Sequence, residues 1–137
     1  MSTAVDPTWR QCLYLSHLAD GCRYDVFTRL AQCSRRHNAE HGIGGCLLFD
    51  GQRFCQLIEG PPAAVAALWL HIQRDRRHRD IRLLFDRLLP LPPGPAGWAY
   101  GYCGADDLDG FDNPALRHCP DALAAFEAIR ASADLAR

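Results

Sequence analysis

The sequence predicts an α+β domain in which a five-stranded mixed sheet carries two helices on one face and a third helix on the other. Three observations support this class. Five short apolar runs resemble strands, two amphipathic segments with helical spacing lie between them, and an Asp-Gly pair joins two of the runs as in a β-hairpin. The 137 residues, 48% apolar and 23% charged, fit one ordinary folded domain.

The first predicted strand is Gln11–Ser16, and a helix follows over residues 24–41. Alternation along the strand places Tyr14 on one face and its two leucine neighbours on the other. The helix carries a stripe at helical spacing that we expect to face the sheet: Val26, Leu30, Cys33 and His37. Gly42 stands where a C-terminal cap is expected, so the helix should end before it.

A hairpin and a second helix come next. Ile43–Phe49 and Arg53–Glu59 are apolar runs separated by Asp-Gly-Gln, a strong hairpin signal. Gly-Pro-Pro then ends the second of these strands and starts a helix over Ala63–Gln73. Its apolar residues recur at helical spacing: Val65, Leu68, Trp69 and Ile72.

Strands at Ile81–Leu88 and Trp98–Cys103, a loop, and an alanine-rich helix over Asp121–Leu135 complete the prediction. The order β-α-β-β-α-β-β is ferredoxin-like, so the first and third strands should be neighbours, and we expect them to run parallel. We divide the chain into a domain of residues 1–104 and a C-terminal extension of residues 105–137.

Composition argues against several classes of protein. The net charge of -1 gives the chain no general attraction to nucleic acid or to membranes. The seven cysteines are odd in number and lie mostly in apolar runs, which favours reduced thiols and a cytoplasmic location. The sequence has neither a signal-peptide pattern nor an apolar run long enough to cross a bilayer.

Gln56 is the first candidate for a functional role. It shares a strand face with Phe54 and Ile58, and this apolar face should meet the helices. A buried carboxamide without partners costs about 1–3 kcal/mol, so Gln56 needs a partner. Tyr14 on the neighbouring strand can supply one, either as a structural pair in the core or as part of a ligand site.

His37 and Asn38 form the second candidate, near the end of the first helix. An Asn side chain offers a donor and an acceptor, which suits a ring carbonyl beside a ring N–H. From these residues alone, a frayed helix end with polar side chains is the simpler interpretation. Cys33, His37 and His41 also recur on one helical face, but metal binding would need a further ligand, and we expect no metal.

The arginines of residues 74–82 could contact phosphate groups or form a solvated face. Without interleaved aromatic residues or glycines, this run does not predict nucleic-acid binding. No Ser-His-Asp set, zinc-protease motif or phosphate loop is present, so we expect no enzyme activity.

Four motifs in register resemble the BLUF family, the blue-light sensors that use FAD. They contain Tyr14 in LYLS, Asn38 in RHNAEHGIGG, Gln56 in RFCQLIEGP and Trp98 in GWAYGY, and the likeness extends over residues 11–104. The resemblance implies a blue-light photoreceptor that binds FAD between the two helices of residues 24–41 and 63–73.

The resemblance also implies roles for single residues. Light would drive a hydrogen-bond switch among Tyr14, Gln56 and the flavin, with Trp98 as a competing electron donor. The cofactor-binding set implied by the family is Tyr14, His37, Asn38, Gln56, Arg77 and His78. Two positions depart from the family: Gly44 stands where Thr is usual, and Tyr100 stands where Met is usual.

Output would pass to a downstream protein partner or change the oligomeric state. The sheet face opposite the flavin is rich in leucine, and the last helix has too narrow an apolar stripe to cover it, so we expect a homodimer or higher oligomer. Two alternatives remain open on the sequence. One is a small ferredoxin-like enzyme of the acylphosphatase type, and the other is a light-insensitive interaction module.

Overall fold

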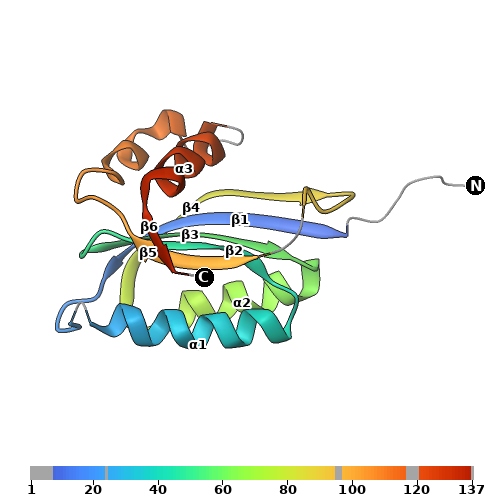
Figure 1. Cartoon of the computed structure of the whole chain (residues 1–137), viewed down its shortest axis with the longest axis horizontal. Helices are drawn as coiled ribbons and strands as arrows, with labels where there is room; N and C mark the ends of the chain where they lie inside the picture. Colours follow the sequence, from blue (N-terminus) through green and yellow to red (C-terminus); the bar gives the residue numbers. More distant parts are fainter. Residues whose placement is uncertain (1–7, 24, 95–96, 117–120, 137) are drawn as a thin grey trace, which may run out of the picture.

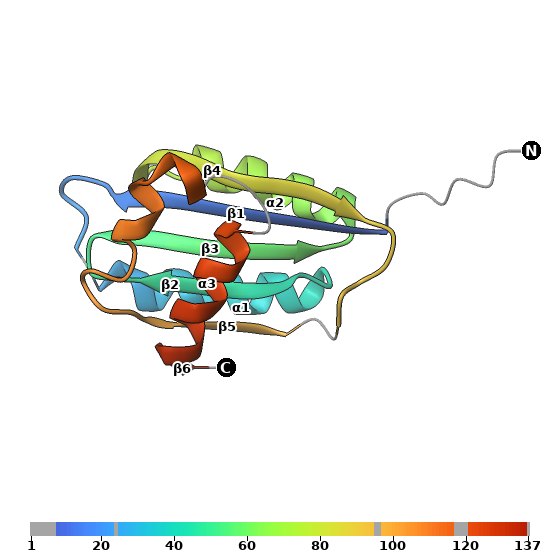
Figure 2. The ribbon, with the colours of Figure 1, turned by 90° about the horizontal axis from the view of Figure 1, so that it is seen from above.

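A six-stranded sheet separates two helices on one face from a C-terminal cap, residues 105–116 and 121–132, on the other, as Figures 1 and 2 show. The computed structural model describes residues 8–23, 25–94, 97–116 and 121–136. Its strands are β1 Trp9–Leu18, β2 Gly44–Phe49, β3 Arg53–Gly60, β4 His78–Leu89, β5 Trp98–Tyr102 and β6 Asp134–Ala136. Its helices are α1 Val26–Glu40, α2 Pro62–Arg74 and α3 Asp121–Ser132, with 3₁₀ turns η1 Asp109–Asp112 and η2 Pro114–Leu116.

The sheet order is β4-β1-β3-β2-β5-β6, which confirms that β1 and β3 are neighbours. The expected parallel pairing was wrong, because β1 and β3 run antiparallel. The reason lies in the connections. Helix α1 returns the chain so that β2 runs in the direction of β1, and the hairpin then reverses β3 against both. Only β2 and β5 pair in parallel within the described sheet.

The C-terminal end of the chain differs from the prediction. Helix α3 ends at Ser132, and Leu135 belongs to β6, a sixth strand that pairs antiparallel with β5. This pairing needs Gly101, because a Cβ there would lie 1.9 Å from the backbone oxygen of Asp134. Three residues are too few to show strand periodicity, so the sequence pattern did not reveal β6.

Helix α1 turns a slightly different face to the sheet than the sequence pattern suggested. Its buried residues are Phe27, Ala31 and Asn38, whereas Cys33 is exposed. Phe27 stacks on Phe49 with ring centroids 4.9 Å apart, and both rings belong to an apolar cluster between α1 and the sheet. The stripe is therefore offset toward Phe27, because this larger ring fills the space over β2 and β3.

The opposite sheet face is covered by the chain itself. Leu13, Leu15 and Cys55 point into a core that the cap closes with Leu108, Phe111, Ala122 and Phe126. On β2 the alternation assigns Cys46 and Leu48 to this face. The sequence analysis expected the narrow apolar stripe of α3 to leave part of this face exposed, so that a second copy would cover it. This premise was wrong, because the 3₁₀ segment supplies further apolar side chains that cover the face within one chain.

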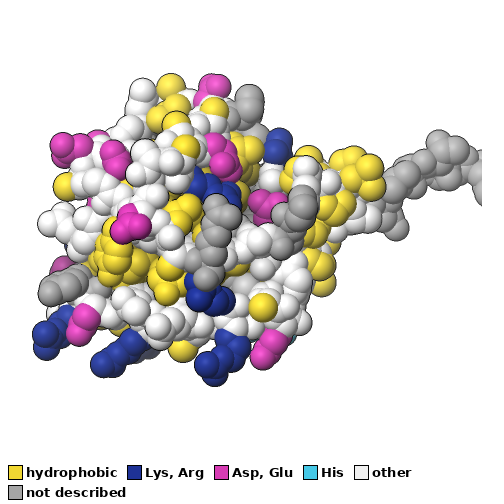
Figure 3. Space-filling view, in the orientation of Figure 1, with side chains coloured by type: hydrophobic (Ala, Val, Ile, Leu, Met, Phe, Trp, Pro, Cys, Tyr) yellow, Lys and Arg dark blue, Asp and Glu magenta, His cyan; other side chains and the backbone are white. Residues whose placement is uncertain are grey.

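Arg53 anchors the cap to the β2–β3 hairpin. Its guanidinium donates to Asp50 at 2.9 Å, to Asp109 at 2.6 Å and to the Ala105 carbonyl at 3.1 Å. The surface charge is uneven. In Figure 3 basic side chains project from the lower edge, where α1 runs, and acidic side chains are spread over the cap. Within the described residues, no helix is both long and apolar enough to span a membrane.

Candidate functional site

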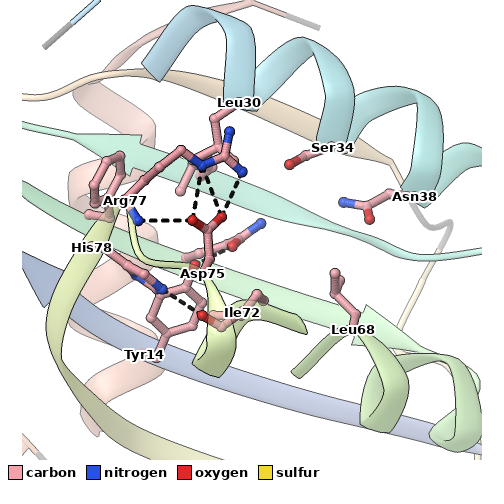
Figure 4. Close-up of a pocket in the computed structure, with 12 residues that line it drawn as sticks. Tyr14, Leu30, Ser34, Asn38, Leu68, Ile72, Asp75, Arg77 and His78 are labelled. Carbon is pink, nitrogen blue, oxygen red and sulfur yellow. Dashed lines mark hydrogen bonds and ion pairs between the residues drawn. The ribbon is translucent and has the colours of Figure 1, made fainter. Parts of the chain in front are cut away.

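A cavity lies between α1 and α2 above the centre of the sheet (Figure 4). Its inner part has a volume of about 50 Å³ and reaches Tyr14 and Gln56 on the sheet. Its outer part, about 240 Å³, opens between the helices beside His37 and His71. Ser34, Asn38, Leu68, Ile72, Asp75 and Arg77 line both parts, so the two form one site.

Tyr14 and Gln56 form the floor of this cavity. They are direct partners across β1 and β3, and the Tyr14 hydroxyl donates a 2.6 Å hydrogen bond to Gln56 Oε1. Both side chains are almost fully buried, at 4% exposure each. The strand alternation places them on the helix side, while Cys55 points to the opposite face. A short bond between neutral groups in a buried place fixes the orientation of both side chains.

The surroundings of Tyr14 keep its phenol protonated. Burial raises the pKa of Tyr14, and the nearby Asp75 carboxylate disfavours a tyrosinate further. The Tyr14 ring lies against Trp69 of α2, with centroids 5.4 Å apart, and against His78 of β4 at 6.2 Å. In the ground state, therefore, Tyr14 acts as a hydrogen-bond donor.

Asn38 is the clearest sign of a ligand-binding site. Its side chain is fully buried, yet neither Oδ1 nor Nδ2 has a hydrogen-bond partner in the protein. Figure 4 shows it projecting from α1 toward the cavity. An unpaired buried carboxamide is unfavourable, so the site calls for a ligand that offers an acceptor and a donor side by side. The backbone holds Asn38 in place, because its carbonyl accepts bonds from the amides of His41 and Ile43.

Asp75, Arg77 and His78 form a rigid corner where α2 passes into β4. Arg77 donates to Asp75 through Nη2 at 2.6 Å and through Nε at 2.9 Å. Burial raises the pKa of Asp75, but the hydrogen bonds and charge of Arg77 outweigh this effect and hold that pKa below its usual value. A positively charged group paired with a carboxylate therefore borders the cavity at this end.

His78 lies deeper than the sequence suggested. Its Nε2 donates to the Ile72 carbonyl at 2.6 Å, and its Nδ1 lies 2.8 Å from the Ser16 hydroxyl. The ring thus ties the end of α2 to β1 and lines the inner part of the cavity beside Tyr14. Because a carbonyl can only accept, Nε2 carries a proton, and in the neutral ring the Ser16 hydroxyl donates to Nδ1.

The remaining expected residues lie farther from the floor. His37 lines only the outer part of the cavity and stacks on His41 with centroids 4.2 Å apart. Burial lowers the pKa of His37, as do His41 and His71. Trp98 does not line the cavity and packs with Tyr100 against the Phe27 cluster. Across the described ranges, no three His, Cys, Asp or Glu side chains gather as a metal site.

The structure adds three residues to the site that sequence reasoning missed: Ser34, Asp75 and Trp69. Ser34 lies four residues before Asn38, and this helical spacing could have indicated a shared face. Asp75 lies inside a run of arginines, and the composition of that run gave no sign that its carboxylate would line a cavity. Trp69 belonged to the apolar stripe of α2, which gave no sign that it would meet Tyr14.

The donor and acceptor set fits the flavin that the sequence resemblance implies. Asn38 offers both hydrogen-bonding functions of an amide to a planar heterocycle, and Gln56 offers its amide from the floor. Apolar side chains, among them Leu68 and Ile72, flank the same space, which suits a flat aromatic ring.

Comparison with known proteins points the same way. The family model described as "BLUF: Sensors of blue-light using FAD" matches residues 10–90. The chain is 34% identical over 86 residues to the blue light- and temperature-regulated antirepressor BluF of Escherichia coli (strain K12), covering 62% of this chain and 21% of that protein. It is 30% identical over 98 residues to the photoactivated adenylate cyclase subunit beta of Euglena gracilis, covering 72% of this chain and 11% of that protein. The chain thus spans a small part of these relatives.

Solved structures share the fold. The dark-state structure of BlrB, a BLUF protein, superposes with a TM-score of 0.71 at 23% identity and covers 92% of this chain and 97% of that chain. The photo-activated state of BlsA superposes with a TM-score of 0.75 at 19% identity and covers 94% and 99% of the two chains.

Proposed function

The chain belongs to the BLUF family of blue-light sensors that use FAD, and we propose that Tyr14 and Gln56 form its light-operated hydrogen-bond switch. The family assignment makes it an FAD-binding photoreceptor, a sensor rather than a catalytic domain. What we propose is the role of each residue in binding the flavin and in the hydrogen-bond switch.

The observation that supports the site most strongly is the unpaired carboxamide of Asn38. It lies on the same cavity as the Tyr14–Gln56 pair, fully buried and without a partner for either polar atom. A flavin edge carries a carbonyl beside a ring N–H, which can satisfy both atoms at once. We assign Asn38 to this edge and Gln56 to the neighbouring part of the ring.

FAD, when bound, supplies the absorption of blue light and a strong one-electron oxidant in its excited state. Tyr14 can then give up an electron, and the phenol proton has a short path, because Gln56 Oε1 accepts the Tyr14 hydrogen bond at 2.6 Å. The two ends of a carboxamide have nearly the same shape. Rotation or tautomerisation of Gln56 therefore changes which partner receives its hydrogen bond at little steric cost.

We assign Arg77 and His37, which line the outer part of the cavity, to the outer parts of the cofactor. Arg77 lies at the mouth of the cavity and is charged at all physiological pH values, so it suits the phosphate groups. His37 lines the outer part and is assigned to the pyrimidine side of the ring. Both ring nitrogens of His78 have partners within the protein. We therefore assign His78 to holding α2 against β1 and lining the inner part of the cavity, in place of the phosphate contact that the family resemblance implied.

The signal reaches a protein partner in this proposal. Relatives named as an antirepressor and as adenylate cyclase subunits combine a similar segment with much longer chains. We place the output surface on the cap, where the exposed carboxylates of Asp106 and Asp107 suit a partner with a basic surface. A homodimer is not required, because the cap already covers the apolar sheet face.

Absorption spectroscopy tests this function directly. The purified protein should carry FAD, and blue light should produce a small red shift that reverts in the dark. The shift is expected because a new hydrogen bond to the flavin carbonyl alters its absorption. A protein that binds no flavin, or whose bound flavin shows no reversible shift, would contradict the proposal.

A further inference from the structure

Trp69 is the aromatic residue nearest to Tyr14 among the ring contacts of the described chain. The two ring centroids are 5.4 Å apart, with an interplanar angle of 50°. The other ring against Tyr14 is His78, which is far harder to oxidise than an indole. Trp98 and Tyr100 contact each other, and Tyr100 contacts Phe27. The neighbour of Tyr14 that can readily lose an electron is therefore on α2, not on β5.

The two rings differ in their access to water. Tyr14 is 4% exposed, whereas Trp69 is only partly buried. A positive charge is stabilised better where water reaches it than in a buried, apolar place. The positive charge left on Tyr14 when it loses an electron is thus more stable once it has moved to Trp69.

We propose that Trp69 is an electron donor to photo-oxidised Tyr14. The step rests on the proposed role of Tyr14 as the residue that gives an electron to the excited flavin. While the oxidised phenol still carries its proton, one electron passes from the Trp69 indole to Tyr14. Tyr14 is restored as the neutral phenol, and Trp69 becomes a radical cation. No bond forms or breaks and no proton moves, and later recombination with the reduced flavin returns the electron to Trp69.

This step competes with the hydrogen-bond switch. If the phenol proton leaves toward Gln56 first, an electron from Trp69 would produce a buried tyrosinate. Burial raises the pKa of Tyr14, so a tyrosinate is unfavourable there. Proton transfer therefore closes the side path, whereas electron transfer from Trp69 before that moment ends the excitation without switching. Trp69 lowers the yield of the red-shifted state in this scheme.

Transient absorption after a blue laser pulse tests the inference with the flavin-loaded protein. The natural protein should show the broad visible absorption of a tryptophan radical, and Trp69→Phe should lose it while its yield of the red-shifted state rises. Trp9→Phe is a matched control, because Trp9 is a buried indole bonded to Glu59 that has no ring contact with Tyr14 among the described residues. This control should keep the signal. An unchanged signal in Trp69→Phe, or no tryptophan radical in the natural protein, would overturn the inference.

A complementary variant avoids any change at position 69. The chain has three tryptophans, so Trp9→Phe combined with Trp98→Phe leaves Trp69 as the sole indole. The radical signal should persist in this double variant, and its loss would assign the signal to another tryptophan and overturn the inference, even if Trp69→Phe does not fold.

Tyr14→Phe separates this inference from the proposed function. A red-shifted state of normal yield in Tyr14→Phe would refute the role of Tyr14 itself. Loss of the red shift together with the tryptophan radical supports the route through Tyr14. If the red shift is lost but the Trp69 radical still forms, the proposed Tyr14–Gln56 switch stands, and electron transfer from Trp69 to Tyr14 is overturned.

Discussion

The Tyr14 hydroxyl and Gln56 Oε1 lie 2.6 Å apart across two antiparallel strands at the floor of a cavity. Their register makes them direct neighbours, and the strand alternation turns both toward the two helices. The Tyr14 hydroxyl donates directly to the Gln56 carboxamide, so under the proposed function light has only to change the direction of an existing hydrogen bond.

Replacing Asn38 by Leu should have opposite effects on cofactor binding and on stability without flavin. The change removes two unpaired polar atoms from a buried place, so the flavin-free protein should gain about 1–3 kcal/mol in free energy of unfolding. FAD affinity should fall about 5- to 150-fold because the ligand loses its bonds to the amide. Denaturant unfolding and flavin titration measure the two quantities. Equal FAD affinity in both proteins would exclude Asn38 from the site.

Arg77→Gln should raise the pKa of Asp75. Arg77 holds this pKa below its usual value, so the pair stabilises the fold above the unfolded-state pKa of about 3.9 and loses its contribution as pH falls through the lower folded-state pKa. The stability difference between the natural protein and Arg77→Gln should therefore be present at neutral pH and shrink in acid. It should be small, about 1 kcal/mol or less, because Arg77 is 45% exposed.

The carboxyl resonance of Asp75 followed by NMR during an acid titration provides the measurement. A titration midpoint that is the same with and without Arg77 would show that the ion pair does not persist in solution.

Much of this architecture follows from patterns that a sequence makes visible. Alternation on β1 and β3 placed Tyr14 and Gln56 on one face, and the Asp-Gly turn located the hairpin between the helices. The antiparallel direction of β1 and β3 was missed because strand direction depends on how each connection reverses the chain. The contact between Trp69 and Tyr14 depends on how α2 rotates over the sheet, which residue spacing along one helix does not define.

Arg53→Met should weaken the attachment of the cap. The Asp50 carboxylate is only 3% exposed and would lose the guanidinium bonded to it, while Asp109 would lose its bond to the hairpin. We expect a loss of about 1–3 kcal/mol in free energy of unfolding. Arg23→Met is the control, because its ion pair with Asp25 is long and exposed and should contribute little. Urea denaturation compares the variants, and equal midpoints would contradict the anchoring role.

Gly101→Ala should detach β6 from β5. A Cβ at this position would lie 1.9 Å from the Asp134 backbone oxygen, so the two strands could not stay paired. Hydrogen exchange should show loss of protection in β6. Gly94→Ala is the matched control, because a Cβ there meets nothing within 4 Å. Unchanged protection in Gly101→Ala would show that β6 does not pair with β5 in solution.

Light-minus-dark absorption of Gln56→Leu tests the central claim most directly. Leucine is close to glutamine in size, and Asn38 and the apolar lining still hold the cofactor, so the variant should bind FAD. It cannot exchange a hydrogen bond between Tyr14 and the flavin, since it has neither a donor nor an acceptor. The account predicts a flavin-loaded Gln56→Leu protein with no reversible red shift under blue light, beside a normal shift in the natural protein. A red shift of normal size and recovery in Gln56→Leu would contradict it.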